Sequence, residues 1–346
     1  MRQYLLMFCI FSLVALMCCI HSKGSSDKNE NLVAMGATFP QPFYNVVSSD
    51  YAKKTGIKID YNGTNSGNHI RAFHDKVIDF AAANAFLSDE SMKEFDSEIL
   101  QIPSTLGAIV LTFNIPNVKN LNLTGTVIAD IYLANIVCWN DPLIAELNPE
   151  VDLPDLPIIP VCRSDESDIT YTFSYYLNAI SSEWERKRGV GKFFESKRGI
   201  VVKGNLAVTT TVQEVEGGIG YTGLEHASLW GAPVAAIRNS SGNFIKPSRY
   251  SIQQAAKVEL PDDLRVFLVN SDREEAYPIC SFSWLFVYKN QGYNSRSFQK
   301  CENLKSFFNY VLSPEAQRVA NKLSYSPLPP EVVCRAKKLV DSIEWK

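Results

Sequence analysis

Short apolar runs alternate with longer amphipathic stretches from Leu32 onward, and this alternation limits the fold more than any other feature. Strands and helices that alternate in this way are typical of an α/β protein. The first unit is NLVAMGATF, a predicted strand ending in a glycine turn, followed by PQPFYNVVSSDYAKKTG. Proline suits the first turn of a helix and glycine its C-terminal cap, so Pro40 to Gly56 is expected to be helical.

The same rhythm predicts elements along the rest of the chain. Strands are expected in IKIDYNG, AAANAF and GAIVLTFNI, and SGNHIRAFHDKV is expected to form a second helix. Apolar residues recur at helical spacing from Ala129 to Leu147, and PIIPVCRSDESDITYTFSYYLNAI joins a strand to a helix through a polar turn. Near the end, AYPICSFSWLFVYK is a strand-rich crossing, and ENLKSFFNYVLSPEAQRVANKL is expected to be an amphipathic helix.

Length and composition indicate two globular lobes with ordinary cores. The chain has 346 residues, of which 46% are hydrophobic and 21% charged. The formal net charge of −3 gives no basic footprint for nucleic acid, which argues against a nucleic-acid partner. If the chain binds an anion, a local site must hold it.

The N-terminus has the layout of an export signal. Met1-Arg2-Gln3 precedes an apolar run from Tyr4 to Ile20, so residues 1–22 are expected to be a signal peptide or a lipoprotein signal. Residues 23–31 form a polar stretch that we expect to be a flexible tether. Three outcomes stay open: cleavage near Ser22, a lipid anchor on Cys18 or Cys19, and an uncleaved membrane anchor.

Five of the eight cysteines lie beyond the export segment: Cys138, Cys162, Cys280, Cys301 and Cys334. None of them has CxxC spacing, and none of the four histidines lies in HExxH, so no metal site is expected. Buried apolar thiols are the simplest interpretation, with one or two disulfides as an addition that the sequence leaves open.

Three turns between a predicted strand and a predicted helix carry small polar residues: GATF at 36–39, GTNSGN at 63–68 and RSDESDIT at 163–170. Helix N-termini expose unpaired N–H groups and a partial positive charge, so several of them together can hold an anion. Arg163 could add a forked pair of donors. Each turn alone is explained as an ordinary N-cap, and only their convergence would make a site.

A longer resemblance supports that convergence. The stretch GATFPQPFYNVVSSDYAKKTGIKIDYNG, and later VIDFAAANAFLSDE, IPSTLGAIVLTFNIP, GGIGYTG and EEAYPICSFSWLFVYK, are similar to the substrate-binding component of the bacterial ABC phosphate-uptake system. The resemblance runs from about Val33 to Val333. It implies a type II periplasmic binding protein fold, with two mixed-sheet α/β lobes joined by two crossovers and a ligand cleft between them.

The resemblance also implies where the lobes and the ligand lie. Lobe I would comprise residues 32–114 plus 280–346 and lobe II residues 115–279, with crossovers near 113–116 and 277–283. The phosphate-binding positions that it implies are Thr38, Phe39, Ser66, Asn84, Arg163, Ser167, Asp168 and Ile169. Asp165 matches the carboxylate that pairs with the binding arginine and so orients it as a hydrogen-bond fork.

Three of these positions depart from the family pattern. Asn84 stands where the family has an aspartate that accepts the proton of a protonated phosphate, which puts discrimination against sulfate in doubt. Asp168 and Ile169 replace a glycine and a threonine, and whether Thr170 recovers the lost hydroxyl stays open.

Glu166 replaces another glycine, so two carboxylates join a turn expected to face an anion. Two like charges 4 Å apart repel by about 1 kcal/mol in water and by about 4 kcal/mol at an effective dielectric constant of 20. An inward carboxylate would weaken binding by orders of magnitude, whereas outward ones would change little.

The function expected from these observations is that of an exported solute-binding protein. It would capture inorganic phosphate or a related oxyanion in an interlobe cleft for ABC-type uptake, as a monomer without cofactors. An ABC permease would be its partner, its location periplasmic or extracytoplasmic, and its membrane contact limited to a lipid anchor. The alternative is a diverged surface or secreted protein with another ligand or an interaction role.

No enzymatic activity is expected. A nucleophilic Ser66 or Ser167 would need an adjacent general base, and no histidine follows a catalytic motif. His69 is the nearest candidate, and we expect it to be an exposed helix residue.

Overall fold

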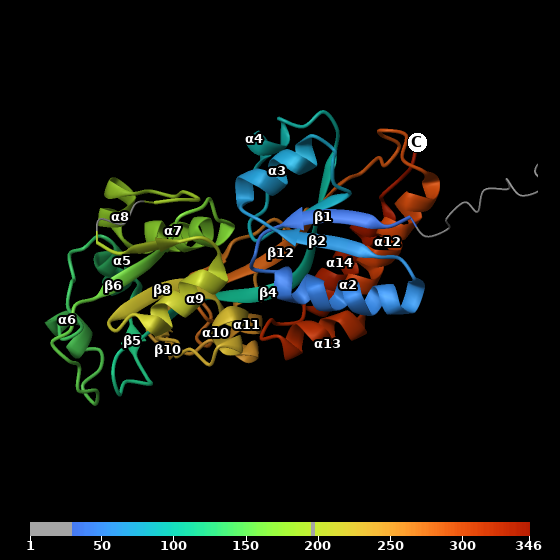
Figure 1. Ribbon diagram of the computed structural model, residues 1–346. Helices are drawn as coiled ribbons and strands as arrows, with labels where there is room; N and C mark the ends of the chain where they lie inside the picture. Colours follow the sequence, from blue (N-terminus) through green and yellow to red (C-terminus); the bar gives the residue numbers. More distant parts are fainter. Residues whose placement is uncertain (1–29, 195–197) are drawn as a thin grey trace, which may run out of the picture.

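The computed structural model describes residues 30–194 and 198–346, which form a two-lobed α/β molecule (Figure 1). The expected export segment, its lipid anchor and most of the tether lie outside these residues. One nine-stranded mixed sheet passes through both lobes in the order β2-β1-β3-β12-β4-β8-β6-β7, with β11 beside β12. Its strands are β1 (Leu32–Gly36), β2 (Ile59–Gly63), β3 (Phe80–Ala83), β4 (Ile99–Phe113), β6 (Ile159–Arg163), β7 (Ile200–Val202), β8 (Gly218–Gly223), β11 (Leu268–Val269) and β12 (Ile279–Tyr288).

Helices cover the sheet in each lobe, and a small sheet of β5 (Asn122–Leu123), β9 (Ala236–Arg238) and β10 (Phe244–Ile245) lies in the second lobe (Figure 1). The helices of the first lobe are α2 (Gln41–Thr55), α3 (Ser66–His74), α4 (Asp89–Met92), α12 (Phe298–Val311), α13 (Pro314–Lys322) and α14 (Pro330–Asp341). Those of the second lobe are α5 (Gly125–Tyr132), α6 (Pro142–Ala145), α7 (Asp168–Ile180), α8 (Ser182–Lys187), α9 (Asn205–Glu214), α10 (Leu224–Leu229) and α11 (Arg249–Ala255).

Strand β4 joins the two halves of the sheet by changing its partner. Its first part, from Ile99 to Ala108, pairs antiparallel with β12, and its last part, from Ile109 to Phe113, pairs antiparallel with β8. Every residue of β4 is buried, which suits a strand covered on both faces. The sequence predicted only the second half of this strand. The lobe bounds expected from the resemblance stay a prediction, but the exchange of partners lies at Ala108 and Ile109.

The expected helix from Pro40 to Gly56 is confirmed as α2, and its C-terminal cap Gly56 has a left-handed φ of 77°. Two other stretches are broken where the spacing suggested continuity. The stretch 129–147 is helical only near its ends, because α5 stops at Tyr132 and Ala134 adopts a φ of 62°. The last expected helix divides into α12 and α13 because Pro314 has no N–H to continue the first.

Four cysteines are free thiols: Cys138, Cys280, Cys301 and Cys334. None of these four therefore forms a disulfide. Burial raises the pKa of the Cys280 thiol, so it stays protonated as a small apolar side chain. In the described part of the chain, no helix combines the length and apolar character needed to cross a bilayer.

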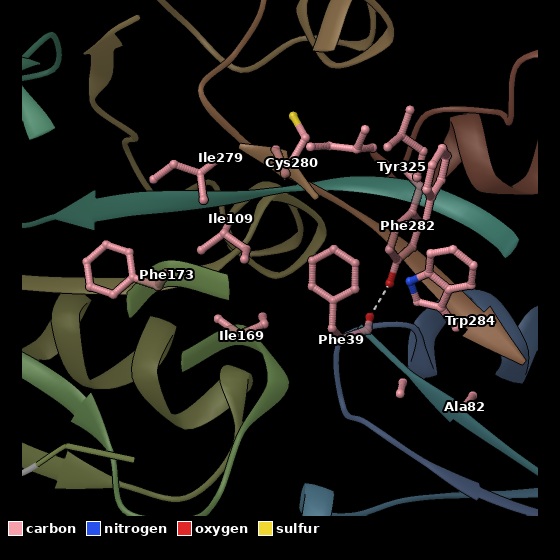
Figure 2. Close-up of a cluster of buried hydrophobic side chains, with 14 of the residues drawn as sticks. Phe39, Ala82, Ile109, Ile169, Phe173, Ile279, Cys280, Phe282, Trp284 and Tyr325 are labelled. Atoms are coloured by element: carbon pink, nitrogen blue, oxygen red, sulfur yellow. Dashed lines mark hydrogen bonds between the residues drawn. The ribbon is translucent and has the colours of Figure 1, made fainter. Parts of the chain in front are cut away.

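The first polar turn is held by aromatic packing beneath it. Figure 2 shows the Phe39 ring in a buried cluster that also contains Tyr325 and, from the second lobe, Ile169. The Phe39 and Tyr325 rings meet edge to face at 5.6 Å between centroids, and the Tyr325 hydroxyl donates to the Phe39 carbonyl. Gly107 of β4 lies directly against the Phe39 ring, since a Cβ there would be 2.4 Å from its Cζ atom. Only glycine leaves room for this ring.

Gly107→Ala should therefore force the Phe39 ring out of its position. We expect the free energy of unfolding, measured by chemical denaturation, to fall by about 1–3 kcal/mol, the usual cost of overpacking a core. Phe39→Leu in the same chain should recover part of this loss. Strictly additive losses in the double variant would contradict the contact.

Candidate anion-binding site

The three polar turns meet at one cavity of about 10 Å³ between the lobes. All the positions implied by the resemblance line it: Thr38, Phe39, Ser66, Asn84, Arg163, Ser167, Asp168 and Ile169. Helix α3 begins at Ser66, α7 at Asp168 and α9 at Asn205, so three helix N-termini face this cavity. The convergence expected from the sequence is therefore present, whereas the role of each residue as a phosphate ligand stays a prediction.

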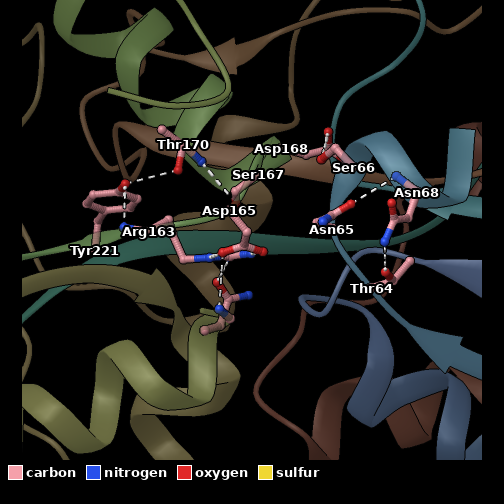
Figure 3. Close-up of polar contacts among 12 residues, drawn as sticks. Thr64, Asn65, Ser66, Asn68, Arg163, Asp165, Ser167, Asp168, Thr170 and Tyr221 are labelled. Atoms are coloured by element: carbon pink, nitrogen blue, oxygen red, sulfur yellow. Dashed lines mark hydrogen bonds and ion pairs between the residues drawn. The ribbon is translucent and has the colours of Figure 1, made fainter. Parts of the chain in front are cut away.

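Arg163 is the buried cation of the site and is fixed by three hydrogen bonds (Figure 3). Its Nε and Nη2 donate to the two carboxylate oxygens of Asp165 at 2.7 and 2.6 Å, and its Nη1 donates to Asn205 Oδ1 at 2.6 Å. A guanidinium has five N–H donors, so one on Nη1 and one on Nη2 remain for a ligand. The pairing with Asp165 expected from the sequence is confirmed.

The charge state of Asp165 follows from opposing effects. Burial raises the pKa of this carboxyl, but the hydrogen bonds and charge of Arg163, with a further N–H from Gly204, outweigh burial and bring the pKa below its usual value. The pair is therefore ionised at neutral pH, and Arg163 acts as an oriented fork whose charge is already balanced.

Asn205 is a site residue that sequence reasoning missed. It is the first residue of α9, follows Gly204 with a φ of 85°, and is 1% exposed. Its Nδ2 has no hydrogen-bond partner among the described residues, and the same is true of Thr38 Oγ1 and of both polar atoms of the Asn84 amide. The only signal in the sequence was a Gly-Asn pair before an apolar helix, which is typical of many turns.

Several polar groups of the third turn form hydrogen bonds within the second lobe. The Ser167 side chain caps α7 by accepting from the Thr170 N–H at 3.4 Å, and the Ser167 N–H donates to the Lys192 carbonyl at 2.9 Å. The Thr170 hydroxyl is bonded to the Tyr221 hydroxyl at 3.0 Å. Thr170 therefore does not replace the hydroxyl that is lost at Ile169.

The two added carboxylates of this turn point in different directions. Glu166 is exposed, whereas Asp168 is 2% exposed. The Asp168 Oδ1 accepts from the Ser66 hydroxyl at 2.6 Å and its Oδ2 accepts from the Asn84 backbone N–H at 3.2 Å. Lys192 Nζ lies 3.3 Å from Oδ1. Asp168 is thus turned into the site, whereas Glu166 lines the cavity at its exposed edge, with its Oε2 beside Gly67 of α3.

Asp168 is an anion in this environment. Burial raises the pKa of its carboxyl, but Lys192, His69, the Ser66 hydroxyl and the Asn84 N–H together bring the pKa below its usual value. The site therefore already holds one negative charge of its own, close to the donors that the resemblance assigns to phosphate.

The expectation that His69 is exposed is wrong. Its side chain is fully buried, because Ser66, His69 and Phe73 recur at helical spacing on the inner face of α3. Neither ring nitrogen has a hydrogen-bond partner among the described residues. Burial lowers the pKa of His69 to about 4, and the nearby Asp168 charge opposes this only in part. The ring is neutral at pH 7.

A wider cavity of about 490 Å³ adjoins the site and shares Thr38 and Asn205 with it. Its other walls come from α2 and α13 of the first lobe and from α9 and α10 of the second. Lys203 and Lys322 lie at this cavity, and both are exposed. An interlobe cleft with two cations therefore borders the small inner site.

Comparison with known proteins identifies the class. A family model described as a PBP superfamily domain matches residues 21–315. The phosphate-binding protein PstS of Haemophilus influenzae is 32% identical over 321 residues, covering 91% of this chain and 92% of that protein. PstS of Methanocaldococcus jannaschii is 35% identical over 320 residues, covering 86% and 82%.

A solved structure agrees in fold. The human phosphate-binding apolipoprotein has a TM-score of 0.74 at 17% identity, covering 89% of this chain and 93% of that one. The two-lobed fold and the interlobe cleft thus define a solute-binding protein of the periplasmic binding class. Within this superfamily the chain belongs to the PstS family of phosphate-binding proteins.

The buried neutral His69 should make stability depend on pH. Its pKa is lowered from 6.5 to about 4 on folding, so the unfolded chain binds the proton more tightly. Above about pH 6.5 His69 is neutral in both states and costs the folded protein no stability. As the pH falls towards 4, the unfolded chain gains a proton on His69 that the folded protein cannot bind, and the free energy of unfolding decreases. Between pH 7 and pH 4 the wild type should lose roughly 3 kcal/mol more free energy of unfolding than His69→Gln. Parallel losses in denaturant titrations of both proteins would contradict this.

Proposed function

We propose that this protein captures inorganic phosphate in the cleft between its lobes, outside the cytoplasm, and delivers it to an ABC-type uptake system. The observation that carries the proposal is the oriented Arg163 fork. Asp165 and Asn205 occupy three of its five donors and leave two for an oxyanion. Because the Arg163 guanidinium is already held in place, it loses little conformational entropy when it binds an oxyanion.

The site suits an anion without being strongly cationic. The charge of Arg163 is balanced by Asp165, so the attraction for phosphate would come from N–H and O–H donors and from the N-termini of α3 and α7. The Thr38 hydroxyl and the Asn205 Nδ2 group, which have no hydrogen-bond partner among the described residues, add two buried polar groups on the side of the wider cavity. Directed hydrogen bonds of this kind distinguish a phosphate-binding site from a surface patch of basic side chains.

Membership of the PstS family supports the remaining parts of the proposal. We propose an ABC permease as the partner that receives the phosphate, and attachment to the membrane, if any, through a lipid on Cys18 or Cys19. We propose no catalytic role for Ser66. Its hydroxyl donates to Asp168, whose lowered pKa makes that carboxylate a weak general base.

Arg163→Lys tests the proposal most directly, because lysine cannot keep both the Asp165 contacts and the two free donors. Calorimetry of the chain without its export segment should show phosphate binding by the wild type and binding about 10–100-fold weaker for Arg163→Lys, the effect of one or more charged hydrogen bonds. Arg249→Lys, at an exposed arginine on α11, is the matched control and should bind like the wild type.

Titrations with sulfate and arsenate belong to the same experiment. Arsenate should bind as phosphate does, since the two anions share shape and protonation. Absence of heat with all three anions would refute the proposed function and leave the alternative of a family member with another ligand.

A further inference from the structure

The chain places one of its own carboxylates at the anion site. Asp168 of the second lobe accepts hydrogen bonds from the hydroxyl of Ser66 and from the backbone N–H of Asn84, and both of these residues belong to the first lobe. These contacts join residues that lie 102 and 84 positions apart. Two donors that could hold a phosphate oxygen are therefore occupied by an internal anion.

The same region carries a further bond between the lobes. The Ser66 N–H donates to the Glu166 carbonyl at 3.1 Å, so the start of α3 is tied to the turn before α7 by both backbone and side chain. Lys192, also in the second lobe, balances the Asp168 charge at 3.3 Å. Lys192, the Ser66 hydroxyl and the Asn84 N–H together offset the cost of burying the Asp168 carboxylate, so groups of the chain itself balance this anion.

The small size of the inner site also indicates that Asp168 competes with an external anion. The cavity of about 10 Å³ is close to the minimum for one water molecule, and a tetrahedral anion with four oxygens is several times larger. With the Asp168 carboxylate in its present position, phosphate can enter the inner site only if side chains or lobes move.

We propose that Asp168 is a tethered competing anion that holds the lobes closed in the absence of ligand and that phosphate must displace in order to bind. The inference rests on the proposed function and adds the residue that regulates the same site. The apparent dissociation constant is then the intrinsic one divided by the fraction of protein whose site is free of Asp168. Removing the carboxylate raises that fraction.

Calorimetry with inorganic phosphate and with sulfate tests the competition in Asp168→Gly and Asp168→Asn. The asparagine variant keeps the volume of the side chain and removes its charge, which guards against loss of folding. We expect Asp168→Gly to bind phosphate at least tenfold more tightly than the wild type. Asp168→Asn should gain less, because its side chain still fills the site. Sulfate should gain by factors similar to those for phosphate, because a displaced competitor opposes every anion alike. Glu302→Gln removes an exposed carboxylate from α12, which does not line the site, and should change affinity by less than about twofold.

Two calorimetric results would overturn the proposal. Equal or weaker phosphate binding in both Asp168 variants would show that the carboxylate does not compete. Loss of phosphate binding with retained sulfate binding would show that Asp168 contacts the bound ligand and accepts its proton. In both cases the wild type still binds phosphate, so the proposed function survives while this inference fails.

Small-angle X-ray scattering of the unliganded proteins tests the closure without any anion. We expect the wild type to be compact and Asp168→Gly to have a larger radius of gyration, because the side-chain link between the lobes is cut. An identical radius of gyration for the two proteins would overturn the inference, whatever calorimetry shows. A larger radius of gyration for Asp168→Gly, together with no anion binding by any variant, would support the role of Asp168 in holding the lobes closed and would refute the proposed function.

Discussion

The exchange of partners along β4 is the constraint on which the rest of the molecule depends. Because one fully buried strand pairs first with β12 and then with β8, two half-sheets become one continuous structure with a helix-covered lobe on each side. The turn containing Phe39 packs directly on this strand through Gly107. The first polar turn is thereby placed opposite the turns of the second lobe, and a site can exist between them.

Charge balance within the site explains how an acidic protein could hold an anion. Each buried charge has a partner: Arg163 is paired with Asp165, and Asp168 with Lys192. Burying an unpaired charge would cost several kcal/mol, so such pairing is needed for the lobes to close. The inner site is consequently close to neutral. The affinity for an external anion therefore depends on which carboxylate points inward.

Much of the local structure could be predicted from sequence because it depends on neighbours along the chain. Pro40 and Gly56 bound α2, and the polar turn after Arg163 leads into α7. Asn205 could not be predicted as a site residue, since its contact with Arg163 joins positions 42 residues apart. The burial of His69 was missed for a related reason: its helix faces the second lobe as well as its own.

The sequence by itself determined the α/β class, the family and the set of turns that could hold an oxyanion, because these follow from periodicity, capping residues and motif order. Tertiary structure alone decided the fate of the two added carboxylates in the third turn. Glu166 and Asp168 have the same charge and nearly the same place in the chain. Glu166 nevertheless stays exposed at the edge of the cavity beside Gly67, whereas Asp168 is buried and reaches Ser66 and Asn84. Only the close approach of α3 and β3 to α7 provides donors for Asp168, and that approach is a property of the closed lobes.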